Sequence, residues 1–166
     1  ANLLSTELKK KIGLLKLLAF DVDGVLTDGG IYLDEKGKET KRFNTKDGLG
    51  IELALEAGFE IALLSGRSSL AVAFRAKELG IKRVFQGVRD KRKVFLSLLK
   101  ELGLASKNAS FMGDDLPDLK LKEMVSVFAC PSDAVDDVRK ASDFVTKKRG
   151  GEGAVREWID LVISLA

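Results

Sequence analysis

Histidine is absent from this chain of 166 residues, and cysteine occurs only once, at Cys130. The single cysteine excludes a disulfide within the chain and fits a reducing compartment. The lack of histidine excludes serine–histidine and histidine-nucleophile mechanisms. Acid–base chemistry near neutral pH therefore has to come from carboxylates, lysine, tyrosine or the cysteine.

Long apolar runs are also missing. No segment approaches the roughly 20 apolar residues that a membrane span needs, and lysines interrupt the leucines of residues 1–18. We therefore expect no secretory leader and no membrane partner, and we expect the protein in the cytoplasm. The formal net charge of +3 is small and spread along the chain, which predicts no nucleic-acid partner.

Short β-like runs alternate with segments of helical periodicity, which is typical of an α/β fold with a doubly wound, mainly parallel sheet. Apolar residues recur at helical spacing in four segments, of which three end at Gly58, Gly80 and Gly103 and the fourth lies at the C-terminus. Most predicted strands are continuous apolar runs, as expected for strands covered on both faces. They span Leu15–Phe20, Glu60–Ser65, Arg83–Phe85, Ala109–Gly113 and Ser126–Ala129.

One connection departs from this alternation. After the first predicted strand, residues 31–33 and 40–43 flank a turn at residues 34–37. This pattern predicts a small β-hairpin insert before a helix that starts near Asp47. The insert is too short to be a separate domain. We therefore expect residues 1–166 to form a single domain.

Polar residues stand where several predicted strands end. Asp21 and Asp23 follow the first strand, Ser65 follows the second, and Asp114 follows the fourth, while Lys91 opens the preceding helix. The carboxyl ends of parallel strands meet at one edge of a sheet, where ligands bind. The sequence therefore predicts a pocket that combines carboxylates, a hydroxyl group and a lysine.

Carboxylates held in one pocket repel each other unless a cation neutralises them. Oxygen ligands without histidine or cysteine favour a hard divalent ion, so Mg²⁺ is the predicted cofactor. Such a site suits phosphoryl transfer to a carboxylate nucleophile, with Ser65 and Lys91 binding the other phosphate oxygens. Each residue alone has an ordinary structural explanation, and only their order at the strand ends favours chemistry.

This order resembles the four motifs of the haloacid dehalogenase-like phosphohydrolase superfamily, over residues 20–118. The resemblance implies that Asp21 is the nucleophile and a metal ligand. It implies that Asp23 is the general acid and base, with its backbone carbonyl on the metal. Ser65 and Lys91 would then bind phosphate, and Asp114 would be the third metal ligand.

Two further acidic residues, Asp115 and Asp118, match positions beside the fourth motif of this superfamily. The resemblance places them around the metal ligands, in direct contact with the metal or behind its ligands. On local sequence alone, Asp118 is equally consistent with the start of a helix.

A closer resemblance rests on residues 43–50, the turn at residues 65–67 and the tail at residues 149–157. These segments are similar to the capless 3-deoxy-D-manno-octulosonate 8-phosphate phosphatases of lipopolysaccharide precursor synthesis. The resemblance implies a small phosphorylated sugar acid as substrate and a homotetramer in which the hairpin and tail close neighbouring active sites. It also implies substrate binding by Arg67, Asn44, Asp47, Arg149 and Gly151.

Several alternatives stay open. Related phosphatases of 9-carbon sugar acids share much of the pattern, and a non-enzymatic, phosphorylatable receiver-like domain would use similar residues in a different order. Locally, Arg67 is equally consistent with a solvent-facing turn, and Asp47 with a helix N-cap. The glycines near Gly151 suit either a close approach to a ligand or a flexible loop.

Overall fold

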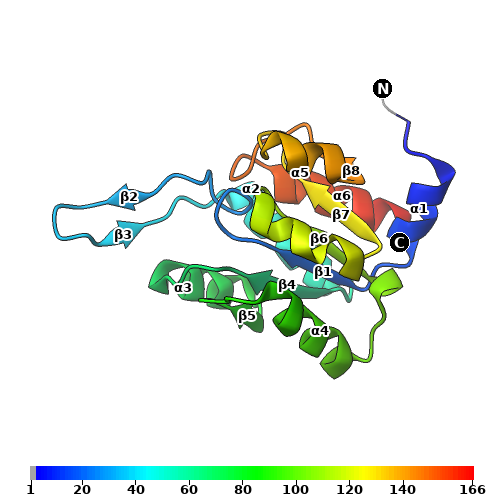
Figure 1. The fold of residues 1–166 in the computed structure, drawn as a ribbon, viewed down its shortest axis with the longest axis horizontal. Helices are drawn as coiled ribbons and strands as arrows, with labels where there is room; N and C mark the ends of the chain where they lie inside the picture. The colour runs from blue at the N-terminus through cyan, green and yellow to red at the C-terminus, as the bar shows by residue number, and fades with distance from the viewer. Residues whose placement is uncertain (1–2) are drawn as a thin grey trace.

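The computed structural model describes residues 3–166 and contains a six-stranded sheet, a two-stranded hairpin and flanking helices (Figure 1). Among these residues, no helix combines the length and apolarity needed to cross a membrane. The strands are β1 (Leu17–Phe20), β2 (Tyr32–Leu33), β3 (Glu39–Thr40), β4 (Glu60–Leu64), β5 (Arg83–Phe85), β6 (Ala109–Met112), β7 (Val127–Cys130) and β8 (Phe144–Val145). The helices are α1 (Thr6–Gly13), α2 (Thr45–Glu56), α3 (Leu70–Leu79), α4 (Lys91–Leu102), α5 (Asp136–Ala141) and α6 (Ala154–Leu165), with 3₁₀ helices η1 (Ser106–Asn108) and η2 (Leu116–Met124).

The main sheet is parallel throughout and has the strand order β5-β4-β1-β6-β7-β8. Alternate residues of β1 point to opposite faces, so that Leu18 and Phe20 join one core while Leu17 and Ala19 join the other. Residues of α1, α2, α3 and α6 fill the first core, and residues of α4, η2 and α5 fill the second. The predicted doubly wound, mainly parallel fold is confirmed.

Local sequence predicted some ends of helices correctly and others incorrectly. Gly80 and Gly103 end α3 and α4 with left-handed backbone angles, as their positions predicted. Helix α2 starts earlier than expected, because Asn44 accepts a hydrogen bond from the Lys46 amide and acts as its N-cap. The alternative left open from the sequence, in which Asp47 is the N-cap of this helix, is therefore wrong. Elements α1, α5 and β8 were not anticipated, since α5 and β8 are short and α1 carries little apolar surface.

The predicted hairpin is present as β2 and β3, which pair antiparallel and project away from the sheet (Figure 1). Its turn is built by Asp34, whose carboxylate accepts hydrogen bonds from the amides of Lys36 and Lys38. Gly37 takes a positive φ of 75° in this turn. At the base of the hairpin, Thr27 and Phe43 form one more bridge, so the insert leaves and rejoins the body beside the end of β1.

Candidate active site

The carboxyl ends of β1, β4 and β6 open into a cleft with a volume of about 340 Å³. Strand β1 lies between β4 and β6, so the loops after these three strands are neighbours in space. Eight of the residues singled out in the sequence line this cleft. They are Asp21, Asp23, Ser65, Arg67, Lys91, Asp114, Asp115 and Asp118.

Asp21 stands at the floor of the cleft because it directly follows the buried strand β1. Its amide donates to the carbonyl of Met112 over 2.9 Å, which extends the pairing of β1 with β6 by one residue. The chain then turns sharply, and the Val22 amide donates to the Asp21 carboxylate over 2.7 Å. Gly24 has a φ of 81°, and a Cβ at this position would overlap the Asp114 carboxylate. Glycine is therefore required where this turn packs against Asp114.

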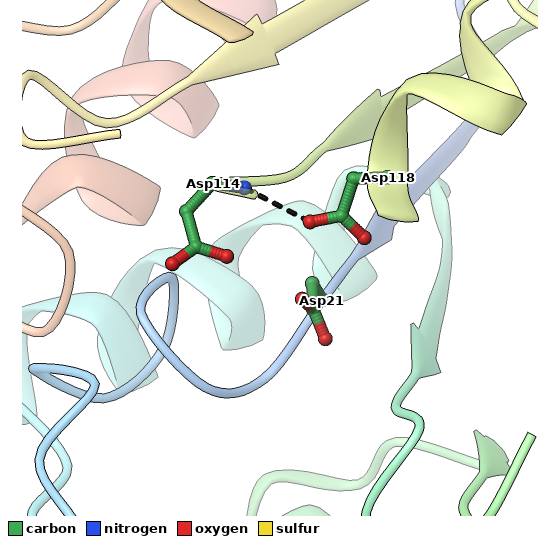
Figure 2. Close-up of side chains that lie close together, drawn as sticks. All are labelled: Asp21, Asp114 and Asp118. Carbon is green, nitrogen blue, oxygen red and sulfur yellow. Dashed lines mark hydrogen bonds between the residues drawn. The ribbon is translucent and has the colours of Figure 1, made fainter. Parts of the chain in front are cut away.

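Three carboxylates form the acidic cluster of the cleft. One oxygen each from Asp21, Asp114 and Asp118 lie within 4.8 Å of one another (Figure 2). Asp118 is only 1% exposed, and its Oδ2 accepts hydrogen bonds from the amides of Asp114 and Asp115 at 3.0 and 3.3 Å. Asp118 thus orients the loop that carries Asp114. Asp115 itself is exposed and caps η2 through the Leu116 amide.

The acidic cluster is electrostatically crowded. Burial, followed by repulsion from Asp118, raises the pKa of Asp21 well above its usual range, although Lys91 opposes this shift. Burial, Asp118 and Asp115 together raise the pKa of Asp114 to about 7. A cation among these oxygens would relieve the repulsion. The donor set, which holds oxygen and neither imidazole nor thiolate, fits a hard divalent cation bound by Asp21 and Asp114.

A buried lysine balances part of this negative charge. Lys91 is the first residue of α4, after the N-cap Asp90, and its Nζ lies 2.7 Å from Asp118 Oδ1 and 3.4 Å from Asp21 Oδ1. Burial lowers the pKa of Lys91, but Asp21 and Asp118 outweigh this effect and leave the pKa raised. The ammonium group is therefore charged and positioned beside Asp21.

Ser65 directly follows β4 and lines the same cleft as Lys91. Its amide donates to the Phe85 carbonyl, and its Oγ accepts the Arg67 amide over 3.3 Å. The residue is buried apart from its contact with the cleft. Its hydroxyl proton remains available to an anion, because the hydroxyl oxygen serves as the acceptor in that contact.

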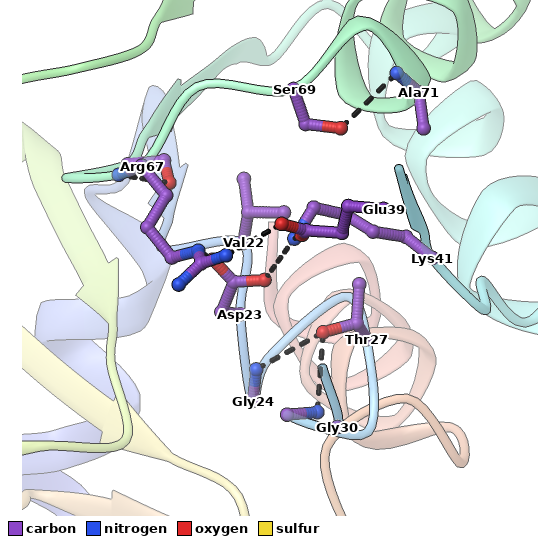
Figure 3. A network of polar contacts seen from close by, with 12 residues as sticks. Val22, Asp23, Gly24, Thr27, Gly30, Glu39, Lys41, Arg67, Ser69 and Ala71 are labelled. Atoms are coloured by element: carbon purple, nitrogen blue, oxygen red, sulfur yellow. Dashed lines mark hydrogen bonds and ion pairs between the residues drawn. The ribbon is translucent and has the colours of Figure 1, made fainter. Parts of the chain in front are cut away.

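Asp23 points to a second polar network instead of the acidic cluster (Figure 3). Its carboxylate pairs with Lys41, which also pairs with Glu39, and Glu39 in turn pairs with Arg67. No sequence motif marked Lys41 or Glu39 as residues of the site. They belong to a run of charged residues in the hairpin, and nothing in that run sets them apart before the chain folds.

The residues expected to bind substrate divide into two groups. Arg67 lines the cleft, whereas Asn44, Asp47, Arg149 and Gly151 do not line it within this chain. The Gly151 amide donates to the Val25 carbonyl over 3.0 Å, and a Cβ on Gly151 would overlap the backbone of Thr27. Gly150 and Gly151 thus allow close packing of the tail against the loop after β1, a role that was not considered from the sequence.

Asp47 has a structural position that the sequence did not reveal. It is 1% exposed, and its Oδ1 accepts the amide of Arg156 over 2.9 Å at the start of α6. The N-cap residue of α6, Gly153, has no side chain to do this. Asp47 therefore satisfies the N-terminus of a helix other than its own. Arg149 is exposed and pairs loosely with Asp133 at 3.5 Å.

The chain matches curated phosphatases over nearly its whole length. It is 40% identical over 159 residues to the 3-deoxy-D-manno-octulosonate 8-phosphate phosphatase of Escherichia coli (strain B / BL21-DE3), covering 96% of this chain and 85% of the relative. The chain belongs to the 3-deoxy-D-manno-octulosonate 8-phosphate phosphatase family. A member of this family from Haemophilus influenzae is 36% identical over 156 residues, covering 94% of this chain and 87% of the relative. No family model matches the chain.

Solved structures of the family agree with this fold. The Yersinia pestis phosphatase superposes with a TM-score of 0.94 at 34% identity, covering 96% of this chain and 86% of that one. The Moraxella catarrhalis phosphatase, solved with a magnesium ion, a phosphate ion and a KDO molecule, gives a TM-score of 0.93 at 41% identity, covering 96% of this chain and 91% of that one. The resemblance stated from the sequence is confirmed, and membership of this family decides against the receiver-like alternative.

Proposed function

We propose that this chain hydrolyses 3-deoxy-D-manno-octulosonate 8-phosphate to the free sugar acid and inorganic phosphate, with Mg²⁺ as cofactor. The observation that carries the proposal is the position of Asp21, at the floor of the cleft with the Lys91 ammonium 3.4 Å away. Membership of the phosphatase family supplies the substrate class. When bound, magnesium would be held by Asp21, Asp114 and the backbone carbonyl of Asp23, and would neutralise charge on the phosphate.

In the first step, an Asp21 carboxylate oxygen attacks phosphorus, and the bond from phosphorus to the sugar oxygen breaks. Asp23 gives its proton to that oxygen, and the free sugar acid leaves. The Ser65 hydroxyl and the Lys91 ammonium bind the remaining phosphate oxygens. In the second step, the Asp23 carboxylate takes a proton from water, and the resulting hydroxide releases phosphate from the aspartyl-phosphate.

The surface of the hairpin supports a further part of the proposal, which is assembly as a homotetramer. Ile31 and Leu33 on the hairpin are 58% and 61% exposed, and Phe74 on α3 is 72% exposed. Apolar groups that stand out from a surface in this way favour burial against a partner. We propose that another copy of the chain covers them, and that the hairpin and the tail around Arg149 complete a neighbouring cleft.

Two expectations from sequence also stay as proposals. Residues 1–166 act as a single domain without a cap, which is supported by the one central sheet and the short insert. The protein works in the cytoplasm, a setting in which its free, buried Cys130 would stay reduced.

The test is phosphate release from a panel that contains the 8-phosphate, a 9-carbon sugar-acid 9-phosphate and glucose 6-phosphate. We expect kcat/KM to be highest for the 8-phosphate. Asp21→Asn keeps the shape of the side chain and removes the nucleophile, so we expect kcat to fall by at least ~10³-fold. A thermal melt of the variant controls for folding. Preference for the 9-phosphate would reassign the substrate, and near-normal turnover by a folded Asp21→Asn would refute the mechanism.

A further inference from the structure

The hairpin supplies a buried cation to the loop after β1. Lys41 follows β3 directly, and its Nζ lies 2.6 Å from Asp23 Oδ1 and 2.6 Å from Glu39 Oε1 (Figure 3). The Lys41 side chain is only 3% exposed. The other carboxylate oxygen of Glu39, Oε2, lies 2.5 Å from a guanidinium nitrogen of Arg67, in the loop after β4. The four side chains thus form a continuous chain of ion pairs, and its two end members, Asp23 and Arg67, line the cleft.

Burying an ammonium group is costly unless carboxylates compensate it closely. Burial alone lowers the pKa of Lys41, but contacts with Asp23 and Glu39 outweigh burial and leave the pKa above its ordinary value. Lys41 is therefore charged and held by two partners. A lysine that served only solubility would be exposed to solvent. The burial of Lys41 therefore indicates a role in its contacts with Asp23 and Glu39.

Asp21, Asp23 and Asp118 all line the cleft, but their carboxylates are held by different contacts. Asp21 accepts the Val22 amide, and Asp118 accepts two backbone amides and Lys91. Within residues 3–166, the only hydrogen bond that the Asp23 carboxylate accepts comes from Lys41. Arg67 lies farther away, with its Nε 3.9 Å from Asp23 Oδ2. The orientation of the Asp23 carboxylate thus depends on a residue of the hairpin.

We propose that Lys41 is a positioning residue that sets the rotamer of Asp23 for proton transfer, and that Glu39 holds Lys41 in place for this purpose. The inference rests on the proposed function, in which Asp23 moves the protons. A carboxylate without this contact would sample other staggered rotamers. To transfer its proton, the Asp23 carboxyl group has to lie within hydrogen-bond distance of the sugar oxygen. A misplaced Asp23 carboxyl group therefore lowers kcat and leaves substrate affinity unchanged.

The test compares leaving groups that need a proton with one that does not. The 8-phosphate ester releases an alkoxide, which has to be protonated, whereas p-nitrophenyl phosphate releases a phenolate that leaves unprotonated. Lys41→Met keeps the length of the side chain and removes its charge. We expect kcat on the 8-phosphate to fall about 10- to 100-fold with KM changed less than about threefold. We expect single-turnover phosphorylation by p-nitrophenyl phosphate to change less than about threefold.

Three companion variants separate positioning from a structural role. Lys41→Arg should restore much of the lost turnover, because it returns a cation to the same place. In an Asp23→Asn background, Lys41→Met should cause no further loss, since the residue on which it acts is already disabled. Lys82→Met removes an exposed lysine before β5 and should match wild type. Thermal melts of all variants report folding.

The positioning role would be overturned if Lys41→Met slowed the reactions of the 8-phosphate and of p-nitrophenyl phosphate equally. It would also be overturned if Lys41→Met reduced turnover as much in the Asp23→Asn background as in wild type. Unchanged turnover of Lys41→Met on the 8-phosphate would overturn it as well. If wild type fails to hydrolyse the 8-phosphate, the proposed substrate is wrong. Glycerol 2-phosphate then replaces the 8-phosphate as the alkyl ester. The role of Lys41 is judged by whether Lys41→Met slows this ester more than it slows p-nitrophenyl phosphate.

Discussion

The backbones of Gly24 and Gly150 lie so close together that a Cβ atom on Gly150 would overlap the Gly24 carbonyl oxygen. On its other side, Gly24 packs against the carboxylate of Asp114. The tail before α6 is therefore in direct contact with the loop that carries Asp21 and Asp23. Only the backbone of Gly24 separates the tail from the acidic cluster, so a displacement of the tail would also displace the groups around Asp114.

Gly150→Ala should test this contact. The added methyl group has no space, so we expect the free energy of unfolding to fall by about 1–3 kcal/mol and kcat to fall with it. Urea unfolding and phosphate release measure the two effects. Gly13→Ala is the matched control, because its Cβ would meet only the Leu165 carbonyl oxygen at 3.4 Å. If Gly150→Ala behaves like the control, the tail does not restrain the loop.

The acidic cluster should make the metal-free protein less stable as the pH rises. The pKa of Asp114 is raised from the ordinary 3.8 to about 7, so between these values the folded protein binds a proton that the unfolded chain has lost. The stabilisation is complete below about pH 4 and is lost as the pH rises through 7. Its upper bound is about 4 kcal/mol.

Urea unfolding in excess chelator, at several pH values, measures this dependence. Other carboxylates also make the free energy of unfolding depend on pH, in either direction. The informative quantity is therefore the difference in the free energy of unfolding between wild type and Asp114→Asn. We expect wild type to lose stability relative to the variant between pH 4 and 7. If the free energies of unfolding of wild type and Asp114→Asn changed in parallel with pH, Asp114 would not retain its proton in the folded protein.

Removal of divalent cations should abolish activity while the protein stays folded. Without a cation, the repulsion among Asp21, Asp114 and Asp118 and the charge of the phosphate are unscreened. We expect added Mg²⁺ to restore phosphate release. Ca²⁺ should bind but support turnover poorly, because its looser coordination fixes the reacting groups less well. Full activity in excess chelator would contradict the assignment of the acidic cluster.

Arg149→Ala should separate specificity from basic chemistry. Its guanidinium is exposed and only loosely paired, so removal leaves the fold of the single chain intact. If it contacts substrate in a neighbouring cleft, kcat/KM on the 8-phosphate should fall about 10- to 100-fold, corresponding to ~1.5–3 kcal/mol. Turnover of p-nitrophenyl phosphate should change little. Arg92→Ala, on the exposed side of α4, is a matched control.

Sedimentation of the same samples tests the assembly. We expect wild type and Arg149→Ala to sediment as the same oligomer, because the change affects a substrate contact and leaves the hairpin surface as it is. A fully active wild-type monomer that still prefers the 8-phosphate would show that no neighbouring subunit completes the cleft.

Much of the fold followed from residues acting locally. Apolar runs such as Glu60–Leu64 and the glycine stops at Gly80 and Gly103 indicated strands and helix ends, because periodicity and left-handed backbone are properties of short segments. The short elements α5 and β8 did not follow, since two to six residues carry too little periodicity. Their positions are decided by packing against β7 and η2.

The sequence by itself determined which residues stand at the ends of strands, and hence that Asp21, Ser65, Lys91 and Asp114 would share one edge of the sheet. Parallel strand order brings together whatever follows each strand. Only the tertiary structure decided that Lys41 reaches Asp23 and that Asp47 serves the N-terminus of α6. Those contacts join residues 18 and 109 positions apart, and partners at such distances are chosen by how hairpin and helices pack, which no local pattern encodes.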